Sequence, residues 1–340
     1  MEMGRLREGG DRALKIAAKR AAYTLVKMLI LLFAVSVISF ALVELSPIDT
    51  VSSYIGENAA SQELRDSIAA KWGLNDPPVT RYFRWLGNIL QGDMGTSITY
   101  RRPVFQIIME RFKMSLILMG LAWVLSGIVG FVLGVLAGTY EGSWLDKLIK
   151  VYCLIIQSSP VFWLAMVVLL IFAVGLNLFP MGLAVPIGKT MESVTFGERI
   201  HHLCLPVLTL SLTGIANIVL QTREKLVQAK KSDYALFARA RGEKRRQFVL
   251  RHGIRNILLP AVTMQFASIS EIFGGSVLAE TVFSYPGLGQ ATTQAGIKGD
   301  IPLLLGIALF SAAFVFFGNL IANILYPIID PRIREGERVG

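Results

Sequence analysis

The chain has 340 residues, of which 53% are hydrophobic and 17% charged, and its mean hydropathy is +0.55. A soluble protein of this length cannot bury so much apolar surface in one core, and the same composition excludes intrinsic disorder. The formal charge of +10 lies outside long uncharged stretches, which excludes a nucleic-acid-binding module and indicates an all-α membrane protein.

A membrane-spanning helix needs about 20 mostly apolar residues. The sequence predicts six such spans: residues 21–45, 114–140, a third beginning near Val151, then 200–222, 256–283 and 301–329. The third is ambiguous because residues 151–188 carry no charge at all. Since its second half is rich in proline and glycine, we expect an external loop or a re-entrant piece there.

The distribution of basic residues predicts the orientation. Eleven of the 34 Lys and Arg residues lie between Arg223 and Arg255, and positive charge marks cytoplasmic loops. Both termini are then cytoplasmic. The expected organisation is a basic N-terminal segment (1–20), a first span (21–45), an extracytoplasmic loop subdomain (46–113), a five-helix core (114–329) with a cytoplasmic loop at 223–256, and a cytoplasmic tail (330–340).

The second span carries small residues at four-residue spacing: Ser126, Gly130, Gly134 and Gly138. Such a face lets another helix approach backbone to backbone. We therefore predict ordinary tight helix packing at this face.

The fifth span places several residues on one helical face: Thr263, Ala267, Glu271, Gly274 and Leu278, with Gly275 beside them. A carboxylate near the middle of a bilayer costs about 3 kcal/mol, so Glu271 should face protein or water. The face either borders a hydrated substrate path or lets Glu271 bond to a neighbouring helix, and the residues leave both open. Glu280 lies about 13 Å further along and is expected near the outer interface.

The basic loop contains a short predicted helix. Ser232 or Asp233 can cap its start, and Gly242 can end it in the left-handed conformation. One face is apolar and aromatic: Tyr234, Phe237, Ala238 and Arg241. This face suits the groove of a partner protein or a position on the lipid headgroups, and the residues alone do not choose between them.

Two patterns that suggest other sites are set aside. Residues 182–190 resemble a phosphate loop, but five residues separate the glycines where the motif needs four. His201, His202 and Cys204 resemble metal ligands, yet adjacent histidines point in different directions on a helix. We expect no catalytic, cofactor-binding or metal-binding residues in this chain.

Several motifs stand in a fixed order along the chain. They are GLNDP at 73–77, GDMGTS at 92–97, the loop at 233–242 continuing through Arg251, His252, Arg255, Asn256 and Pro260, ETVFSYPGLG at 280–289 and DPRIR at 330–334. In this order they resemble inner-membrane permease subunits of ABC importers in the dipeptide/oligopeptide/nickel group. One departure is that Leu236, Phe237 and Ala238 stand where the general coupling motif has Glu-Ala-Ala.

The resemblance implies a fold of six transmembrane helices in the plasma (inner) membrane and a set of partners. These are a second, similar permease subunit, two ATPase subunits that hold ATP and Mg²⁺, and an extracytoplasmic substrate-binding protein. This chain would then be a transport subunit and not an enzyme. The cargo implied is peptide-like, with nickel or a metallophore as the alternative cargo. A remote alternative function is that of an ion-coupled secondary transporter that uses Glu271 and Glu280.

The resemblance also implies site residues. The ATPase-coupling residues are Asp233, Tyr234, Phe237, Ala238, Arg239, Ala240, Arg241 and Gly242. Separately, the face of the fifth span gives the residues expected to border the translocation path: Glu271, Gly274 and Gly275.

Overall fold

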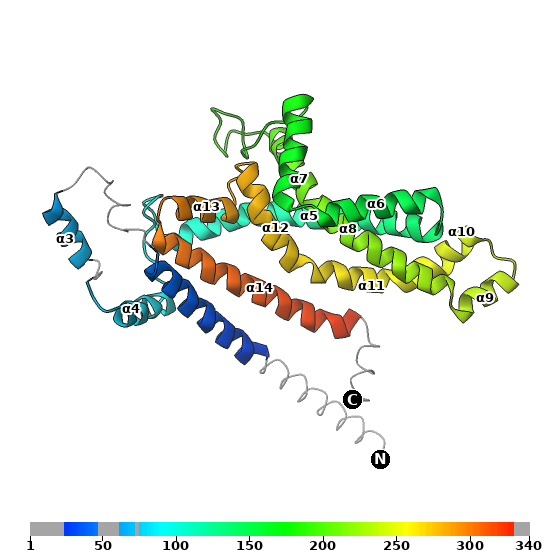
Figure 1. Ribbon diagram of the computed structural model, residues 1–340, viewed down its shortest axis with the longest axis horizontal. Helices are drawn as coiled ribbons and strands as arrows, with labels where there is room; N and C mark the ends of the chain where they lie inside the picture. The colour runs from blue at the N-terminus through cyan, green and yellow to red at the C-terminus, as the bar shows by residue number, and fades with distance from the viewer. Residues whose placement is uncertain (1–23, 47–60, 72–74, 330–340) are drawn as a thin grey trace, which may run out of the picture. The chain divides into compact units, whose positions relative to one another are not determined.

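The computed structural model describes residues 24–46, 61–71 and 75–329, where its elements are helices (Figure 1). After the helix Thr24–Glu44 these are α3 (Gln62–Lys71), α4 (Pro78–Leu90), α5 (Val104–Thr139), α6 (Trp144–Ser158), α7 (Val161–Val168), the π-helical turn η1 (Leu169–Gly175), α8 (Phe196–Lys230), α9 (Asp233–Ala240), α10 (Arg245–Phe248), the π-helical turn η2 (Val249–Gly253), α11 (Ile254–Ala267), α12 (Ile269–Val282), α13 (Leu288–Ile297) and α14 (Ile301–Ile329). The segments expected at 1–20 and 330–340 lie outside the described residues.

Four helices are long and apolar enough to cross a membrane: Thr24–Glu44, Val104–Thr139, Phe196–Lys230 and Ile301–Leu320. Two bent pairs pass the same test together, Trp144–Ser158 with Val161–Gly175, bent by 111°, and Arg245–Ala267 with Ile269–Val282, bent by 48°. In the described part of the chain the number of spans is therefore four, or six if each bent pair is one span. The predicted all-α membrane fold is confirmed.

The third span differs from its expected form. Its first helix, α6, begins at Trp144 rather than near Val151, because the Ser143 hydroxyl accepts a hydrogen bond from the Asp146 amide and caps the helix. The helix stops at Ser158, two residues before Pro160, whose ring does not allow a helix to continue through it. The sharp bend thus lies at residues 159–160, before the Pro- and Gly-rich residues 177–188.

Contacts divide the chain into two units, which we describe separately: residues up to 108 together with 295–320, and residues 109–294 together with those from 321 on. In the first unit α4 packs on the helix Thr24–Glu44. The hydroxyls of Ser36 and Tyr82 are 2.8 Å apart, and the Tyr82 ring lies 5.4 Å from that of Phe40. Arg81 pairs with Glu44 at 2.8 Å. The aromatic residues of α4 therefore fold onto the first span.

The GDMGTS motif has a structural role in the first unit. Asp300 is fully buried and caps the start of α14, since its carboxylate accepts from the Leu303 amide. The same carboxylate accepts from the Ser97 hydroxyl at 2.5 Å and from the Thr99 amide at 2.9 Å. Gly95 adopts a φ of 81°, which allows the turn that brings Ser97 there. The motif holds the beginning of α14.

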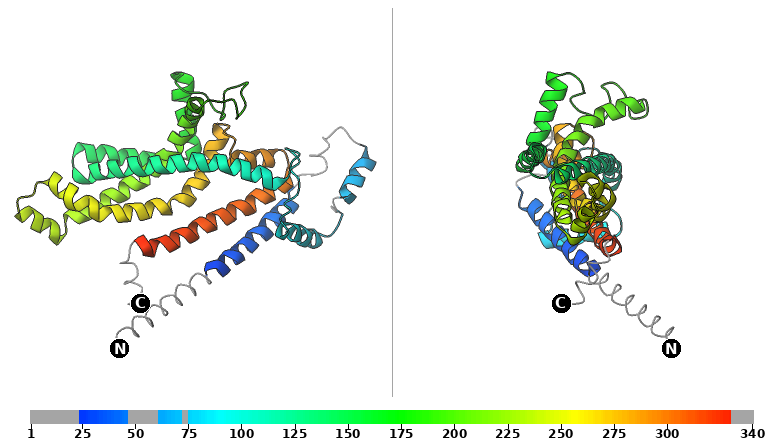
Figure 2. Two further views of the ribbon diagram at one scale, coloured as in Figure 1. Left: turned by 180° about the vertical axis from the view of Figure 1, so that it is seen from behind. Right: turned by 90° about the vertical axis from the view of Figure 1, so that its right-hand side faces the viewer.

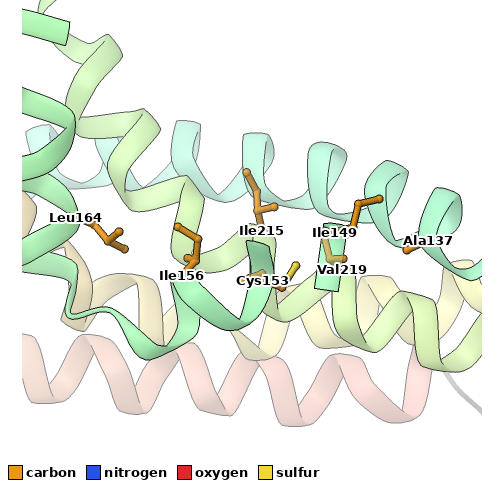
Figure 3. Packing of buried hydrophobic residues seen from close by; sticks show 8 residues of the cluster. Ala137, Ile149, Cys153, Ile156, Leu164, Ile215 and Val219 are labelled. Atoms are coloured by element: carbon orange, nitrogen blue, oxygen red, sulfur yellow. The ribbon is translucent and has the colours of Figure 1, made fainter. Parts of the chain in front are cut away.

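In the second unit α8 is the central helix. It packs against α6, α7, α11 and α12, and the views in Figures 1 and 2 agree on this arrangement. In its most apolar stretch 61% of the residues are buried, against 28% in α5. Figure 3 shows the core that α8 forms with α5, α6 and α7, where these residues meet: Ala137, Ile149, Cys153, Ile156, Leu164, Ile215 and Val219.

The small-residue face of α5 packs against α8 in strict register. The neighbours of Ser126, Gly130, Gly134 and Gly138 are Gly214, Ile218, Thr222 and Leu226. A Cβ at Gly134 would lie 2.6 Å from the Thr222 Cβ and 2.9 Å from the Val219 carbonyl oxygen. The prediction of tight packing is confirmed. Because both sets of numbers increase together, α5 and α8 run in the same direction, as the prediction of a second and a fourth span requires.

Candidate coupling helix and translocation face

The helix α9, Asp233–Ala240, is held at its end by glycine geometry. Gly242 has a φ of 82°, its amide donates to the Arg239 carbonyl at 2.9 Å, and the Glu243 amide donates to the Ala238 carbonyl at 3.1 Å. These two bonds form a Schellman motif, which needs a residue in the left-handed conformation at the glycine position. Ser232 occupies the capping position, but its hydroxyl donates to the Ala229 carbonyl instead of capping.

One face of α9 packs on its own chain. Ala235 and Ala238 are 1% and 4% exposed in a cluster with Leu226 of α8, Phe248 of α10 and Ile257 of α11. The sequence predicted Ala238 on the face offered to a partner or to lipid, and this is wrong because Ala238 packs in the chain's own core. Alanines at these positions let the helix lie close to α8, α10 and α11.

The opposite face of α9 is open. Phe237 is 66% exposed and Leu236, which sequence reasoning did not select, is 58% exposed. Its other exposed members are Asp233, Ala240 and Arg241. Large apolar side chains exposed in one patch are typical of a surface that another protein covers.

Two of the expected coupling residues instead tie α9 to its surroundings. The Tyr234 ring stacks on Phe248, with centroids 5.8 Å apart and planes at 25°. The Arg239 guanidinium donates to the Lys230 carbonyl at the end of α8, at 3.2 Å. Together with Ala238, these side chains fix the position of α9 and leave Leu236 and Phe237 outward.

The end of α8 is in turn joined to the α5–α6 connection. Arg223 forms a bidentate ion pair with the buried Asp146. The Lys230 ammonium donates to the Gly138 carbonyl and to the Glu141 carboxylate, both at 2.9 Å. This hydrogen bond from Lys230 holds the pKa of the Glu141 carboxyl below its usual value. A displacement of α9 would therefore be transmitted to α8 and, through these pairs, to α5 and α6.

The residues expected on the translocation face lie on an open side of the second unit. Glu271 and Gly274 are exposed, and a Cβ at Gly274 would meet no atom within 4 Å. Gly275 is half-buried and packs near Leu210 of α8. Glu271 also bonds to a neighbouring helix, since the Asn217 amide of α8 donates to both its oxygens, at 3.0 and 3.2 Å. The predicted bond to a neighbouring helix is therefore present, and that the face borders a substrate path stays a prediction.

Asn217 also accepts a hydrogen bond of 2.5 Å from the Gln157 amide of α6. Sequence reasoning missed Gln157 and Asn217, although each is a polar residue inside an apolar run. Gln157 stands just before the bend of one broken span, and Glu271 stands in the first turn after the bend of the other. The network Gln157–Asn217–Glu271 thus joins the two helix breaks through α8.

The open faces of α5 and α8 differ in polarity. Every exposed residue of α5 from Leu116 to Leu136 is apolar or a glycine. Along the open side of α8, in contrast, Asn217 is followed by the exposed residues Gln221 and Lys225 at one-turn intervals. Gln221 and Lys225 line a groove of about 330 Å³ between α8 and α11. The face of α5 suits lipid, and that of α8 suits water and solute.

Glu280, which the sequence predicts near the outer interface, is enclosed by the protein itself. Its side chain is fully buried, and its carboxylate accepts from the Gly289 amide at 2.7 Å and the Gln290 amide at 3.3 Å, in the first turn of α13. A Cβ at Gly287 would lie 2.3 Å from this carboxyl group. The ETVFSYPGLG motif therefore builds a helix cap, in which glycine leaves room for the carboxylate.

The two adjacent histidines bind to other parts of the chain. His201 and His202 make hydrogen bonds to two different carbonyls, those of Leu178 and Gly182. No group of three or more His, Cys, Asp or Glu side chains that could hold a metal ion occurs within the described residues.

Two features together define a multi-pass membrane transport protein. One is a set of apolar spans, two of them bent beside a polar network, and the other is an exposed helix in a basic loop. Residues 130–335 match the family described as the binding-protein-dependent transport system inner membrane component, and residues 18–119 match the N-terminal part of such components. The chain belongs to this family, so its predicted place among the ABC importer permeases of the inner membrane is confirmed.

Relatives of known name match almost end to end. The oligopeptide transport system permease protein AppB of Bacillus subtilis (strain 168) is 35% identical over 319 residues, covering 92% of this chain and 99% of its own. The dipeptide transport system permease protein DppB of Escherichia coli (strain K12) is 31% identical, covering 88% and 94%. The di/tripeptide transport system permease protein DppB of Pseudomonas aeruginosa (strain UCBPP-PA14) is 30% identical, covering 89% and 95%.

Proposed function

We propose that this chain forms one half of the translocation path of an ATP-driven peptide importer. A second, similar permease subunit supplies the other half. Two ATPase subunits on the cytoplasmic side bind ATP and Mg²⁺ and hydrolyse ATP, and an extracytoplasmic binding protein delivers the solute. Both termini and the loop at 223–256 lie in the cytoplasm.

The observation that carries this proposal is the open face of α9. Leu236 and Phe237 point away from the chain's own core, on a loop whose eleven basic residues favour the cytoplasmic side. An amphipathic helix of this kind binds in the groove of a partner protein. Because α9 is fixed to α8, and α8 to α5 and α6, closure of the ATPase subunits moves these helices as one body.

The cargo is inferred from the relatives, whose names specify oligopeptides, dipeptides and di/tripeptides. A peptide is a polar solute, and the polar open side of α8 with Glu271, Gly274 and Gly275 supports a path that accepts one. A nickel or metallophore importer is the alternative cargo assignment.

The test is a reconstituted complex of this permease, its partner permease, both ATPases and the binding protein. We expect peptide-loaded binding protein to stimulate ATP hydrolysis and peptide uptake, and Phe237→Ala to abolish the stimulation while the chain stays in the membrane. Phe196→Ala is the matched control, since Phe196 is also exposed, at the opposite end of α8. Peptide uptake without ATP, or full stimulation in Phe237→Ala, would refute the proposal.

A further inference from the structure

We infer that Glu271 is a binding site for a primary ammonium group, and that it takes the free amino terminus of a peptide as the peptide crosses the membrane. Asn217 and Gln157 act as positioning residues for its carboxylate. The identity of the cargo rests on the proposed function, whereas the cation-binding character of the site rests on geometry alone.

The network has one consistent arrangement of donors and acceptors. Because a carboxylate only accepts, Asn217 must present its NH₂ group to Glu271, which leaves the Asn217 carbonyl to accept from Gln157. The Asn217 amide uses one lone pair of each Glu271 oxygen, and each oxygen keeps another. The carboxylate is thus held from one side and free on the other.

The free side of Glu271 is open. The residues one turn before and after it on the same face are Ala267 and Gly274, and both are exposed. A Cβ at Gly274 would have no heavy atom within 4 Å. No bulky side chain of these neighbours shields the carboxylate, so a small cationic group has room to approach it.

The charge of Glu271 has no partner within the described residues. The ion pairs found there all involve other carboxylates, and the only hydrogen bonds given to Glu271 come from Asn217. A negative charge is favoured here because Glu271 lies in the first turn of α12, at the positive end of the helix dipole. A carboxylate in a membrane-spanning segment without a counter-charge is completed by a cation from outside the subunit.

The cation must also reach this depth. Gln221 and Lys225 continue the polar side of α8 from Asn217, whereas the exposed face of α5 offers no polar group between Leu116 and Leu136. Broken helices near the middle of the membrane are a common way for transporters to present polar groups to a solute. The two breaks joined by Gln157, Asn217 and Glu271 meet this description.

The first experiment measures cation preference directly, in membranes that contain the assembled complex. Gly274→Cys places a thiol beside Glu271, and its reaction rates with a cationic and an anionic water-soluble thiol reagent are compared. Ile128→Cys, exposed on the apolar face of α5, is the matched control, and the native chain with Cys153 and Cys204 gives the background. We expect Gly274→Cys to react and Ile128→Cys not to react.

The ratio of the two rates carries the result. We expect the ratio of the cationic to the anionic rate to be roughly tenfold higher when Glu271 is present than in the Glu271→Gln background. Asn217→Ala should lower the ratio, and Glu271→Asp should retain part of it. An unreactive Gly274→Cys, or a ratio unchanged by Glu271→Gln, would overturn the inference.

The second experiment concerns the peptide. In the reconstituted complex, Glu271→Gln is expected to reduce uptake of a free-amine dipeptide by about tenfold. Peptide-stimulated ATP hydrolysis is measured in the native complex alongside uptake. If the native complex shows no peptide-stimulated hydrolysis, the proposed function fails, while the thiol result is unaffected. If the native complex shows that stimulation but Glu271→Gln takes up the dipeptide like the native chain, only the present inference fails.

Discussion

The guanidinium of Arg223 donates to both carboxylate oxygens of Asp146, at 2.5 Å to Oδ1 and 2.8 Å to Oδ2. The Asp146 side chain is fully buried, and the Gly142 amide donates to it at 2.9 Å. The pair joins the central helix α8 to the start of α6, next to the loop that carries α9. It is therefore part of the connection between the end of α8, from which α9 follows, and the neighbouring spans.

Removing the cation from this pair should destabilise the second unit. Arg223→Ala leaves a buried carboxylate without its partner, which costs about 3 kcal/mol. We expect a clear fall in the Tm of the purified permease. Arg255→Ala, which removes an exposed arginine from α11, is the control and should leave Tm nearly unchanged. Equal Tm values for the two variants would show that the pair contributes nothing to stability.

The left-handed conformation of Gly242 predicts a selective loss of coupling. Gly242→Val forces a β-branched side chain into that conformation at a cost of about 2 kcal/mol, although a Cβ there would meet no atom within 4 Å. We expect normal amounts of permease in the membrane and a loss of peptide-stimulated ATP hydrolysis. Gly242→Asn should behave nearly like the native chain, because asparagine tolerates positive φ. Normal stimulation in Gly242→Val would argue against the coupling role of α9.

The packing of α5 on α8 predicts a strong difference between two glycines of the same helix. Gly134→Leu would place a side chain 2.6 Å from the Thr222 Cβ, and such overpacking costs about 3 kcal/mol. Gly120 is exposed and a Cβ there would meet nothing within 4 Å. We expect Gly134→Leu to reduce folded protein and Tm sharply, and Gly120→Leu to be tolerated. The measurement is the yield and Tm of both variants from membranes.

The pair of Glu141 and Lys230 predicts a pH-dependent contribution to stability. Because the hydrogen bond from Lys230 lowers the pKa of Glu141 from about 4.5, the folded state binds this proton less readily than the unfolded state. The contribution of this pair to the free energy of unfolding is then present at neutral pH. It is lost as the pH falls below the ordinary glutamate pKa of about 4.5 and then through the lower pKa of the folded state. Glu141→Gln should have a lower Tm than the native chain at pH 7, and the difference should disappear in acid. Glu192→Gln, at an exposed site, is the control.

The sequence allowed some parts of the site to be predicted from local rules. Gly242 was expected in the left-handed conformation because a short amphipathic run ends there, and its φ of 82° agrees. The face with Ala267, Glu271 and Gly274 was expected from helical spacing, and these residues are exposed together. Both features depend on residues within a few turns of each other.

Other features could not be predicted because they depend on residues distant in sequence. Ala238 is buried since Leu226, Phe248 and Ile257 meet it from three other elements. Glu280 is buried because the chain turns back so that α13 presents its amides to the carboxylate.

By itself, the sequence determined the class of the protein. The length of the apolar runs and the position of the basic loop require a multi-span membrane protein, since the hydrophobic effect and the cost of moving charge across a bilayer act on composition. Only the tertiary structure decided which polar groups meet. Gln157, Asn217 and Glu271 are separated by 60 and 54 residues, and their hydrogen bonds exist because two spans break beside the same stretch of α8. A hydrogen bond requires atoms within about 3 Å, and such distances between remote segments are set by packing.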